Sequence, residues 1–590
     1  MNTISINAAS LFLSLSRLTG PIFQKELRVS SRRKRNYVLR SAYLVSLTVF
    51  MVVIWFDAMD FTSSRATYMA SRLAQAGKQI IVILVWFQFY ATQLVAVVML
   101  STAISDEIYH RTLGVLMTTP ITSLQIIIGK LSSKLVQLIL LLAISLPLLA
   151  IVRIFGGVPW NYIMSSLCMT LTTLIFVGSL SLFFSSFHRK AYVVIILTLF
   201  ALGFFFGLPL LFITRIPLRM LSGNIPLTAL CYTNPYIMLN MNRSVMLDPS
   251  LVGRISFFWP THCGIMLMAS AFVLFGCVRL VRRIALAQAA GHLNVLARLG
   301  QFKMMNSINK TVTTLKSSPI RRVKGPPVVW KELISRISSR ERLVVAIIIG
   351  LEAAMIIAMY LFPVVASNFG YEETHMIYVW IFMGLGTLSV TVFPSTCITS
   401  EKESRTWPLL LTTTLNDWQI LFGKFVGVLR RSLFLWLLLF FYVGMFWAVK
   451  CVGPFALIHI ILIIAGIIAF LSGTGFYFSS RLKHTSEAVI INIALAVTIW
   501  GLLPLLLILF AQAYHSDFGE YYMNIVPFIQ AMVVMVSVFT NASLSSYDWP
   551  GRDRGPMEST CIILTITLVY MFLGVLFAWF AKRRFRRDIF

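Results

Sequence analysis

Long apolar runs set the strongest limit on how this chain can fold. Only 12% of its 590 residues are charged, and apolar runs of about twenty residues, the length at which one helix spans a bilayer, recur along it. We count about twelve of them, at residues 37–56, 79–104, 126–152, 162–187, 191–214, 262–283, 343–365, 375–398, 420–449, 455–478, 488–513 and 560–581. The sequence therefore predicts an all-α polytopic membrane protein with about twelve transmembrane helices.

The distribution of charge predicts the orientation of these spans. The chain has 50 Lys and Arg residues against 21 Asp and Glu residues, which gives a net charge of +29. With both termini in the cytoplasm, the outer loops hold similar numbers of basic and acidic residues, whereas the inner segments hold a large basic excess. This asymmetry is typical of a multi-pass protein of a plasma (inner) membrane. Because the basic residues flank spans, we expect them to attract membrane lipids and not nucleic acid.

One polar segment between two apolar runs occurs twice. Residues 107–130 read EIYHRTLGVLMTTPITSLQIIIGK, and residues 401–424 read EKESRTWPLLLTTTLNDWQILFGK. The copies align without a gap at a shift of 294 positions (401 − 107 = 294), and they share Glu, Arg-Thr, Thr-Thr, Gln-Ile and Gly-Lys. Lys-Glu-Leu before the first span of each half and Phe-Ser-Ser after the fourth span repeat in the same order. The sequence therefore predicts an internal duplication.

The duplication predicts the organisation of the chain. Residues 1–283 form a first six-span unit, residues 284–325 a basic cytoplasmic linker, and residues 326–590 a second six-span unit. Because six is even, each unit returns to the side on which it started, so the two units are parallel repeats. Both copies of the repeated segment are then expected to face the cytoplasm, one in each unit.

The chemistry of the repeated segment favours contact with a partner. The segment is short and lies between rigid spans, so a force on it moves helices. Leu113, Leu116 and Met117 have the spacing of an apolar stripe on a helix, and Glu107 can pair with Arg111 four residues on. The simpler alternative is an ordinary inner loop in which Lys130 and Lys424 only fix the topology. The recurrence of the same residues at the same spacing favours partner contact.

At these residues the chain resembles a known family. The pattern Glu, Arg-Thr, Leu, Thr-Thr-Pro and Gly-Lys between spans two and three is similar to that of the type-2 family of ATP-binding-cassette (ABC) transporter permeases. The resemblance implies that residues 107–120 and 401–414 are coupling helices that dock on a dimer of ABC ATPase subunits. It also implies that the solute path runs between two six-span permease units and that transport is mostly export.

The resemblance also implies the docking residues and brings two departures. The residues implied are Glu107, Arg111, Thr112, Leu116, Thr118, Thr119, Pro120, Glu401, Arg405, Thr406, Leu410, Thr412 and Thr413. Many relatives carry one six-span unit, whereas here two units are fused in one chain. The second copy has Pro408 within its helix and Thr414 where the first copy has Pro120. The two docking segments are therefore expected to differ.

The sequence contains no phosphate-binding loop of the form G-x-x-x-x-G-K-[ST], and Gly129-Lys130 is followed by Leu131. We therefore expect no cofactor in this chain, no enzymatic activity of its own, and ATP bound by a separate partner subunit. The eight histidines are dispersed, so no metal site is expected. Cys231 and Cys263 could both lie near the outer face and pair.

Two other classes of function stay open from the sequence. One is an ion-coupled secondary transporter with parallel repeats, in which Glu352, the one carboxylate clearly inside a predicted span, would be essential. Glu352 could equally line the path of an ABC permease. The other is a membrane scaffold that anchors an ATPase complex and moves no solute.

Overall fold

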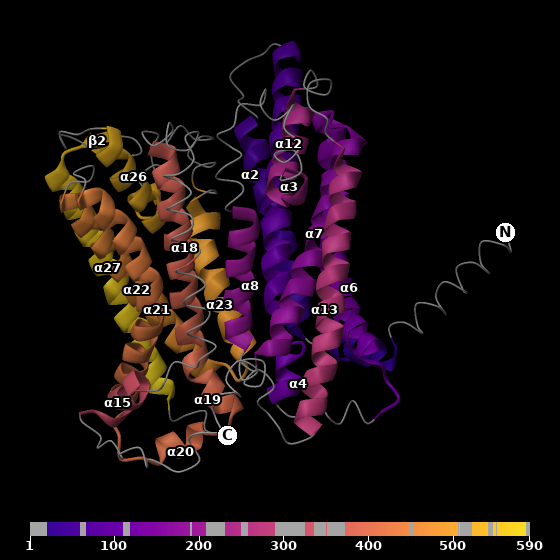
Figure 1. Ribbon diagram of the computed structural model, residues 1–590. Coiled ribbons are helices and arrows are strands. Elements are labelled where there is room, and N and C mark those ends of the chain that lie inside the picture. Colours follow the sequence, from indigo (N-terminus) through magenta and orange to yellow (C-terminus); the bar gives the residue numbers. More distant parts are fainter. Residues whose placement is uncertain are drawn as a thin grey trace. The chain divides into compact units, whose positions relative to one another are not determined.

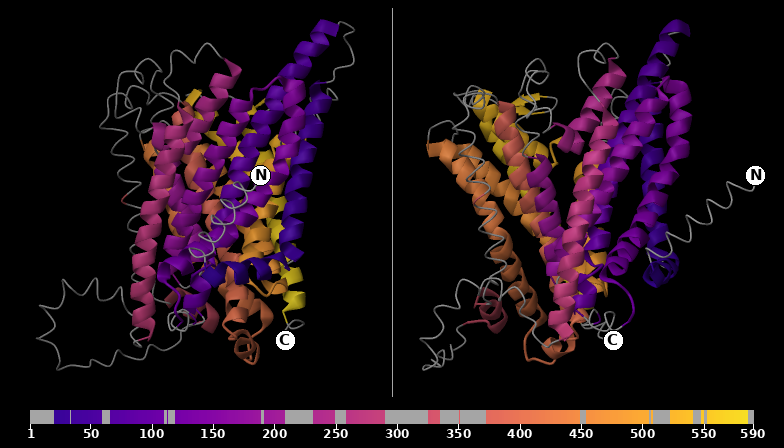
Figure 2. Two further views of the ribbon diagram at one scale, coloured as in Figure 1. Left: turned by 90° about the vertical axis from the view of Figure 1, so that its right-hand side faces the viewer. Right: turned by 45° about the vertical axis from the view of Figure 1, so that its right-hand side comes forward.

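The computed structural model gives the chain two compact units, one of residues 1–210 and 217–321 and one of residues 322–590 together with residues 211–216. We call them unit 1 and unit 2 and describe each by itself. The structure describes residues 20–32, 34–58, 66–109, 112, 119–188, 191–207, 231–248, 258–289, 325–334, 350, 372–448, 454–504, 507, 522–540, 547–549 and 552–585. In each unit the long helices run side by side along one direction (Figures 1 and 2).

Unit 1 is built from helices that pack on α3 and α7. A helix over residues 20–31 comes first, and its later helices are α2 (Lys34–Ala58), α3 (Ala66–Ser101), α4 (Ser105–Tyr109), α6 (Ser123–Gly156), α7 (Trp160–Phe187), α8 (Ala191–Leu202), the π-helical turn η1 (Gly203–Gly207), α12 (Pro235–Leu247) and α13 (Trp259–Ala289). Helix α3 packs against α2, α6, α7 and α8, and α7 packs against α12 and α13.

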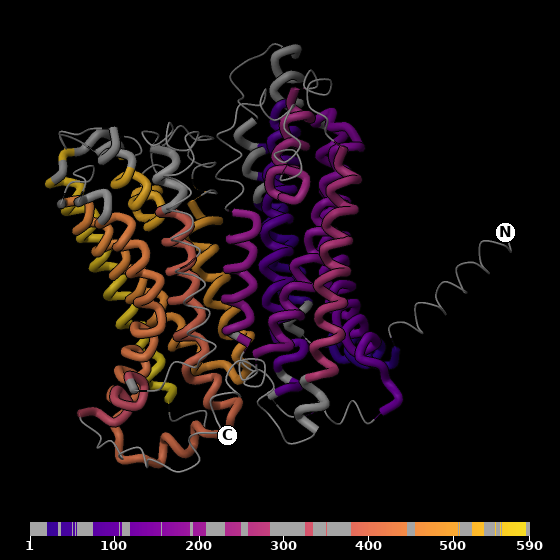
Figure 3. The backbone as a smooth tube through the Cα atoms, viewed as in Figure 1, coloured from indigo at the N-terminus to yellow at the C-terminus, as the bar shows by residue number. Residues whose placement is uncertain are grey.

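Unit 2 repeats this plan around α18 and α22. Its helices are α15 (Pro327–Ile334), α18 (Glu372–Cys397), α19 (Thr399–Glu403), α20 (Trp407–Leu411), α21 (Asp417–Ala448), α22 (Pro454–Arg481), α23 (Thr485–Val497), the π-helical turn η4 (Thr498–Leu502), α26 (Pro527–Thr540) and α27 (Pro556–Arg584). Strands β1 (Tyr547–Trp549) and β2 (Arg552–Arg554) form a short antiparallel hairpin, in which Tyr547 pairs with Arg554. Figure 3 traces these elements as one tube.

The described helices confirm the prediction of an all-α polytopic membrane protein. Among the described residues, nine helices are long and apolar enough to cross a membrane, and two shorter apolar helices accompany them. Each predicted span coincides with described helix over more than half of its length, except the span at residues 343–365, which lies almost wholly outside the described residues. Residues 208–214 of the fifth predicted span and most of residues 505–513 of the eleventh also lie outside them. Helix α3 begins at Ala66, well before the predicted start at residue 79, because a helix continues past the point where its sequence turns polar.

Between η1 and α13 the structure describes residues 231–248, whose helix α12 packs against α7 and α13. Helix α12 is capped by Asn234, whose side-chain oxygen accepts hydrogen bonds from the backbone of Tyr236 and Ile237. The amide nitrogen of Asn234 donates to the carbonyl oxygen of Phe206 in η1. Cys231 and Cys263 are both buried free thiols, so they do not pair in this structure.

Helices α22 and α27 of unit 2 touch backbone to backbone. A Cβ atom added at Gly473 would overlap the carbonyl oxygen of Gly574, and one added at Gly574 would overlap that of Ala469. Glycine removes the side chain that would hold the two backbones apart, and small residues are the usual means of close helix packing in membranes. The pair fixes the last helix of the chain against the centre of unit 2.

Candidate functional site at the repeated segments

The second repeated segment forms two short helices at one end of unit 2. Helix α19 follows directly on α18, and α20 lies between α19 and the start of α21. Helix α15 lies at the same end of the unit, which is the lower end in Figure 1. The segment therefore comes close to the short helix that precedes the spans of its own unit.

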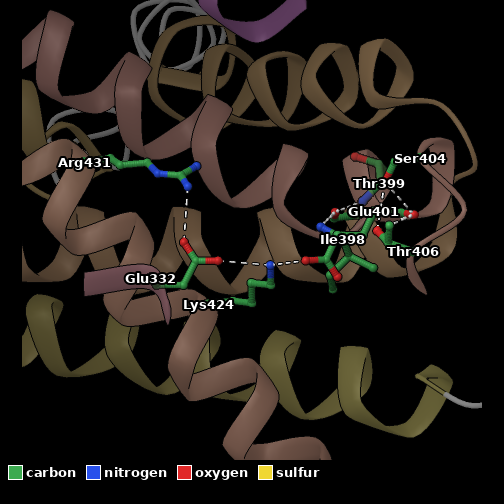
Figure 4. A network of polar contacts seen from close by, with 9 residues as sticks. Glu332, Ile398, Thr399, Glu401, Ser404, Thr406, Lys424 and Arg431 are labelled. Carbon is green, nitrogen blue, oxygen red and sulfur yellow. Dashed lines mark hydrogen bonds and ion pairs between the residues drawn. The ribbon is translucent and has the colours of Figure 1, made fainter. Parts of the chain in front are cut away.

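Lys424 joins three elements at this end of unit 2 (Figure 4). Its ammonium nitrogen lies 3.1 Å from a carboxylate oxygen of Glu332 on α15 and also pairs with Glu401 on α19. The second oxygen of Glu332 lies 3.2 Å from the guanidinium of Arg431 on α21. The side chain of Lys424 is 8% exposed and that of Glu332 is 11% exposed. A lysine at this depth needs such partners, because an unpaired buried charge is costly.

Charge around Glu332 lowers the pKa of its carboxyl. Burial alone would raise this pKa, since it disfavours the charged form. The nearby positive charges of Lys424, Arg431 and Lys331 outweigh burial, so the pKa of Glu332 lies below its ordinary value. The carboxylate is therefore ionised at neutral pH and holds α15 against α21.

Unit 1 contains a similar network, in which Lys130, Glu107 and Glu26 correspond to Lys424, Glu401 and Glu332, while the second cation, Lys134, is not at the position of Arg431. The ammonium nitrogen of Lys130 on α6 lies 2.8 Å from Glu107 on α4 and 3.9 Å from Glu26, which is in the helix over residues 20–31. Lys134 lies 3.8 Å from the other oxygen of Glu26, and Lys130 also donates to the carbonyl oxygen of Ala103 at 2.6 Å. The repeated Glu and Gly-Lys of the sequence are thus the two ends of one ion pair.

Each network balances its own charge. Two carboxylates meet two cations in unit 1 and again in unit 2. In both units, the second oxygen of the acid on the repeated segment, Glu107 or Glu401, is buried and accepts no hydrogen bond from a described residue. The central lysine is thus the described ion-pair partner of that acid.

The repeated Arg-Thr pair closes the short helix that carries the acid. Arg405 has a left-handed backbone with φ of 58°, its N–H donates to the carbonyl oxygen of Lys402 at 3.1 Å, and the N–H of Thr406 donates to that of Glu401 at 2.9 Å. These are the two bonds of a Schellman motif, in which the left-handed position is usually glycine. In unit 1, Thr112 makes the same bond to the carbonyl oxygen of Glu107 at 3.0 Å.

The repeated glutamine starts the span that follows the segment. In unit 1, Thr122 and Gln125 form a capping box, with each side chain bonded to the backbone of the other residue. In unit 2, the side chain of Gln419 accepts a hydrogen bond from the backbone of Asn416 at 3.2 Å. Gly423 leaves room for α15, because a Cβ atom there would lie 2.5 Å from the side chain of Val328.

Helix α20 is held by a buried aromatic residue. Trp407 is 2% exposed and packs edge to face on Phe585 at the end of α27, with ring centroids 4.7 Å apart. Leu410 is partly buried against the same apolar cluster. Pro408 lies in the first turn of α20, where the missing backbone N–H costs nothing, so it does not interrupt the helix.

Two charged residues bind the second segment to the start of α23 and to the end of α22. The carboxylate of Glu403 accepts hydrogen bonds from the backbone N–H of Thr485 at 2.7 Å and from its hydroxyl at 2.6 Å. Lys402 donates to the carbonyl oxygens of Ser480 and Leu482. The corresponding residues of unit 1 are Ile108 and Tyr109, so the expected difference between the two segments includes these charged contacts.

The residues of the segment that face outward form a small mixed surface. Leu409 is 69% exposed, although it is apolar and lies on a helix too short to span a membrane. Arg405, Thr406, Thr412 and Thr413 are exposed beside it in sequence. In unit 1 the exposed predicted residues are Thr112, Thr119 and Pro120.

Some predicted residues lie outside the described part of the chain. They are Arg111, Leu116, Thr118 and Glu352. The expected pair of Glu107 with Arg111 therefore falls outside the described residues, and the structure pairs Glu107 with Lys130. In unit 2, Arg405 follows the end of α19 and Glu401 pairs with Lys424. The described residues contain no group of His, Cys, Asp and Glu arranged to hold a metal ion.

Sequence reasoning missed Glu26, Glu332 and Leu409 as site residues. The two acids belong to the repeated Lys-Glu-Leu, which the alignment of the two halves already contained. A repeated acid and a repeated lysine near membrane ends were a usable signal for an ion pair. Leu409 gave no such signal, because the turn between α19 and α20 decides which leucine faces outward.

The helices and the twin networks define a multi-pass membrane protein that braces one polar segment at an end of each unit. Residues 21–280 match the family model described as ABC-2 family transporter protein. This match supports an ABC-2 type permease domain over that part of the chain, which lies within unit 1. No curated protein matches the chain.

Proposed function

We propose that the chain is the transmembrane subunit of an ABC exporter, with two permease units fused in one polypeptide. Residues 1–283 and 326–590 are the two units, and residues 284–325 are the cytoplasmic linker between them. A dimer of separate ATPase subunits binds and hydrolyses ATP. The family match to residues 21–280 supports the permease role of unit 1. The repeated contacts of unit 2 extend that role to the second half.

The recurrence of one buried network in both units carries the proposal. In each unit a lysine of the span after the segment holds an acid of the segment and an acid of the helix before the first span. These ion pairs make the segment, the preceding helix and the following span one connected body. A push on the segment is then passed to the membrane helices and is not absorbed by a loose loop.

The exposed surface supplies the contact with the ATPase. Leu409 gives an apolar anchor, and Arg405 gives a charge that can reach an acidic group of the partner. Thr412 and Thr413 lie at the rim. Such a mixture of one apolar anchor, one arginine and polar neighbours suits a protein interface. In this proposal Glu107 and Glu401 do not contact the ATPase; their buried ion pairs stabilise the conformation of the segment that carries the surface.

ATP-driven closure of the ATPase dimer draws the two segments together and rocks the units to open the path outward. This requires both segments on the cytoplasmic side of a plasma membrane, with both termini on that side. The even number of predicted spans in each unit and the excess of basic residues on the inner segments support that orientation. The sequence has no phosphate-binding loop of its own, which supports ATP binding in a partner.

Reversal of charge on both segments tests the docking role. The double variant R111E/R405E is expected to insert normally and to lose the ATPase that co-purifies from native membranes. The matched control is R282E/R283E at the end of α13, which changes the charge equally and leaves the segments intact. Retention of the ATPase by R111E/R405E at the level of the control would refute the proposal.

A further inference from the structure

Each unit contains a helix break just before its repeated segment. Helix α3 ends at Ser101 and α4 begins at Ser105, while α18 ends at Cys397 and α19 begins at Thr399. Proline does not explain both breaks. Unit 2 has Pro394 near the end of α18, but the equivalent residue of unit 1 is Leu100 (394 − 294 = 100).

The shared cause is a serine from the fourth span of each unit. The hydroxyl oxygen of Ser185 on α7 accepts hydrogen bonds from the backbone N–H of Ile104 at 3.1 Å and of Ser105 at 2.9 Å. Its own hydrogen goes to the carbonyl oxygen of Ser101, at 2.9 Å. The hydroxyl therefore takes the place of the helical hydrogen bond that would otherwise run from the backbone N–H of Ser105 to the carbonyl oxygen of Ser101. A side chain inserted in this way bends a helix.

Unit 2 has the same two acceptor bonds at Ser479 on α22, while the carbonyl oxygen of Ser395, which corresponds to Ser101, accepts a hydrogen bond from the hydroxyl of Thr399 at 3.0 Å. The hydroxyl oxygen of Ser479 accepts from the backbone N–H of Ile398 at 3.0 Å and of Thr399 at 3.0 Å. Figure 4 shows these two residues next to Glu401. Both serines are fully buried. Two buried amides at each break therefore depend on one hydroxyl of a neighbouring helix, and a buried donor without an acceptor is unfavourable.

We propose that Ser185 and Ser479 are positioning residues of a hinge. Each serine fixes the angle at which the segment leaves its span, and it passes movement of the segment to α7 in unit 1 or to α22 in unit 2. The purpose of this hinge rests on the proposed docking function. The hinge itself is a property of the chain alone, so it can be tested without an ATPase.

The neighbouring serines provide matched controls. The hydroxyl of Ser480 is also buried, but it donates within α22, to the carbonyl oxygen of Tyr477 at 2.8 Å. S479A and S480A thus remove the same atom from adjacent buried sites. In unit 1, Ser186 donates to Phe183 in its own helix but also lies 3.8 Å from the thiol sulfur of Cys277 on α13, so the pair S479A and S480A in unit 2 is the closer match.

The experiment measures the distance between α20 and α22 in the full-length protein in lipid nanodiscs. Genetically encoded spin labels replace Leu409 and Ile461, which are both exposed, so the native cysteines stay in place. We expect S479A to shift or broaden the distance distribution, and S480A to leave it unchanged. We also expect the amides of Ile398 and Thr399 to exchange about tenfold faster in S479A, as for the loss of one hydrogen bond.

A second variant keeps the test decisive if S479A does not fold. S479C retains a side chain of similar size with a weak acceptor, and we expect it to give the same change to a smaller degree. An unchanged distance distribution and unchanged exchange in a folded S479A or S479C would overturn the hinge. Failure of the docking proposal would appear instead in protein without labels, as retention of the ATPase by R111E/R405E, and it would leave the effect of S479A on the distance distribution unchanged.

Discussion

Lys424 and Glu332 form a buried ion pair, 3.1 Å long, that joins α21 to the short helix before the spans of unit 2. The equivalent residues of unit 1, Lys130 and Glu26, lie 3.9 Å apart, and Glu26 is 30% exposed against 11% for Glu332. The ion pair between the lysine and the acid of the preceding helix is therefore shorter and more buried in unit 2 than in unit 1. This difference provides a comparison within one chain.

We predict that E332Q is more damaging than E26Q. The glutamine amide introduced by E332Q would keep the shape of the side chain but remove the negative charge shared by Lys424 and Arg431, which we expect to cost about 2 kcal/mol. At Glu26, with its longer and more exposed contacts, the cost should stay below about 1 kcal/mol. Thermal unfolding of both variants in the same detergent measures the difference. Equal losses would show that the closer geometry in unit 2 contributes nothing.

The lowered pKa of Glu332 predicts a dependence of stability on pH. A carboxyl whose folded-state pKa is below its unfolded value stabilises the fold above the unfolded value, about 4.3 for glutamate. This stabilisation is lost as pH falls through the folded-state pKa. Wild type should therefore unfold at a higher temperature than E332Q at pH 7, and the gap should close below about pH 4. A gap that persists undiminished at low pH would contradict this assignment.

The backbone contact between α22 and α27 predicts that substitution of Gly473 strongly destabilises the fold. G473A places a methyl group against the carbonyl of Gly574, and overpacking of this kind costs about 1–3 kcal/mol or more. G466A on the same helix is the control, because its added Cβ would lie 3.5 Å from the nearest atom, Thr567 Cα. Size-exclusion chromatography and thermal unfolding should show loss of folded protein for G473A alone. Similar behaviour of both variants would argue against the close contact.

Two adjacent leucines separate partner contact from folding. L409S alters an exposed side chain, so we expect unchanged thermal stability and about tenfold weaker binding of the ATPase, the effect of a typical interface anchor. L410S alters a side chain that packs on the apolar cluster around Trp407, so it should lower thermal stability. Binding titrations and unfolding curves of the two variants test this. If L410S weakened binding of the ATPase and L409S did not, the prediction that the exposed face of α20 contacts the ATPase would be wrong.

Hydropathy predicted the spans well because a bilayer demands long apolar helices wherever a chain crosses it. It could not predict the breaks before the repeated segments. The sequence stays apolar through Ile104 and Ile398, and the breaks depend on hydroxyls that come from a helix about eighty residues away in sequence.

The repeated segment was found from sequence, but the roles of its residues were not. Recurrence of Glu and Lys marked both as important, and we interpreted the acids as contacts for a partner. The structure instead turns Glu107 and Glu401 toward lysines of the same chain. Recurrence in both halves indicates that a residue has a role. The structure is needed to show whether that residue lies on the exposed surface of the segment or supports it from below.

The shared lysine also sets an order for biosynthesis. In each unit both acids leave the ribosome before the lysine does, since Glu26 and Glu107 precede Lys130, and Glu332 and Glu401 precede Lys424. A nascent chain halted before the third span of a unit therefore holds two carboxylates that repel each other. Arrival of the lysine turns that repulsion into attraction, and because Lys130 and Lys424 lie near the start of α6 and α21, the network can close only once synthesis has entered the third span of the unit.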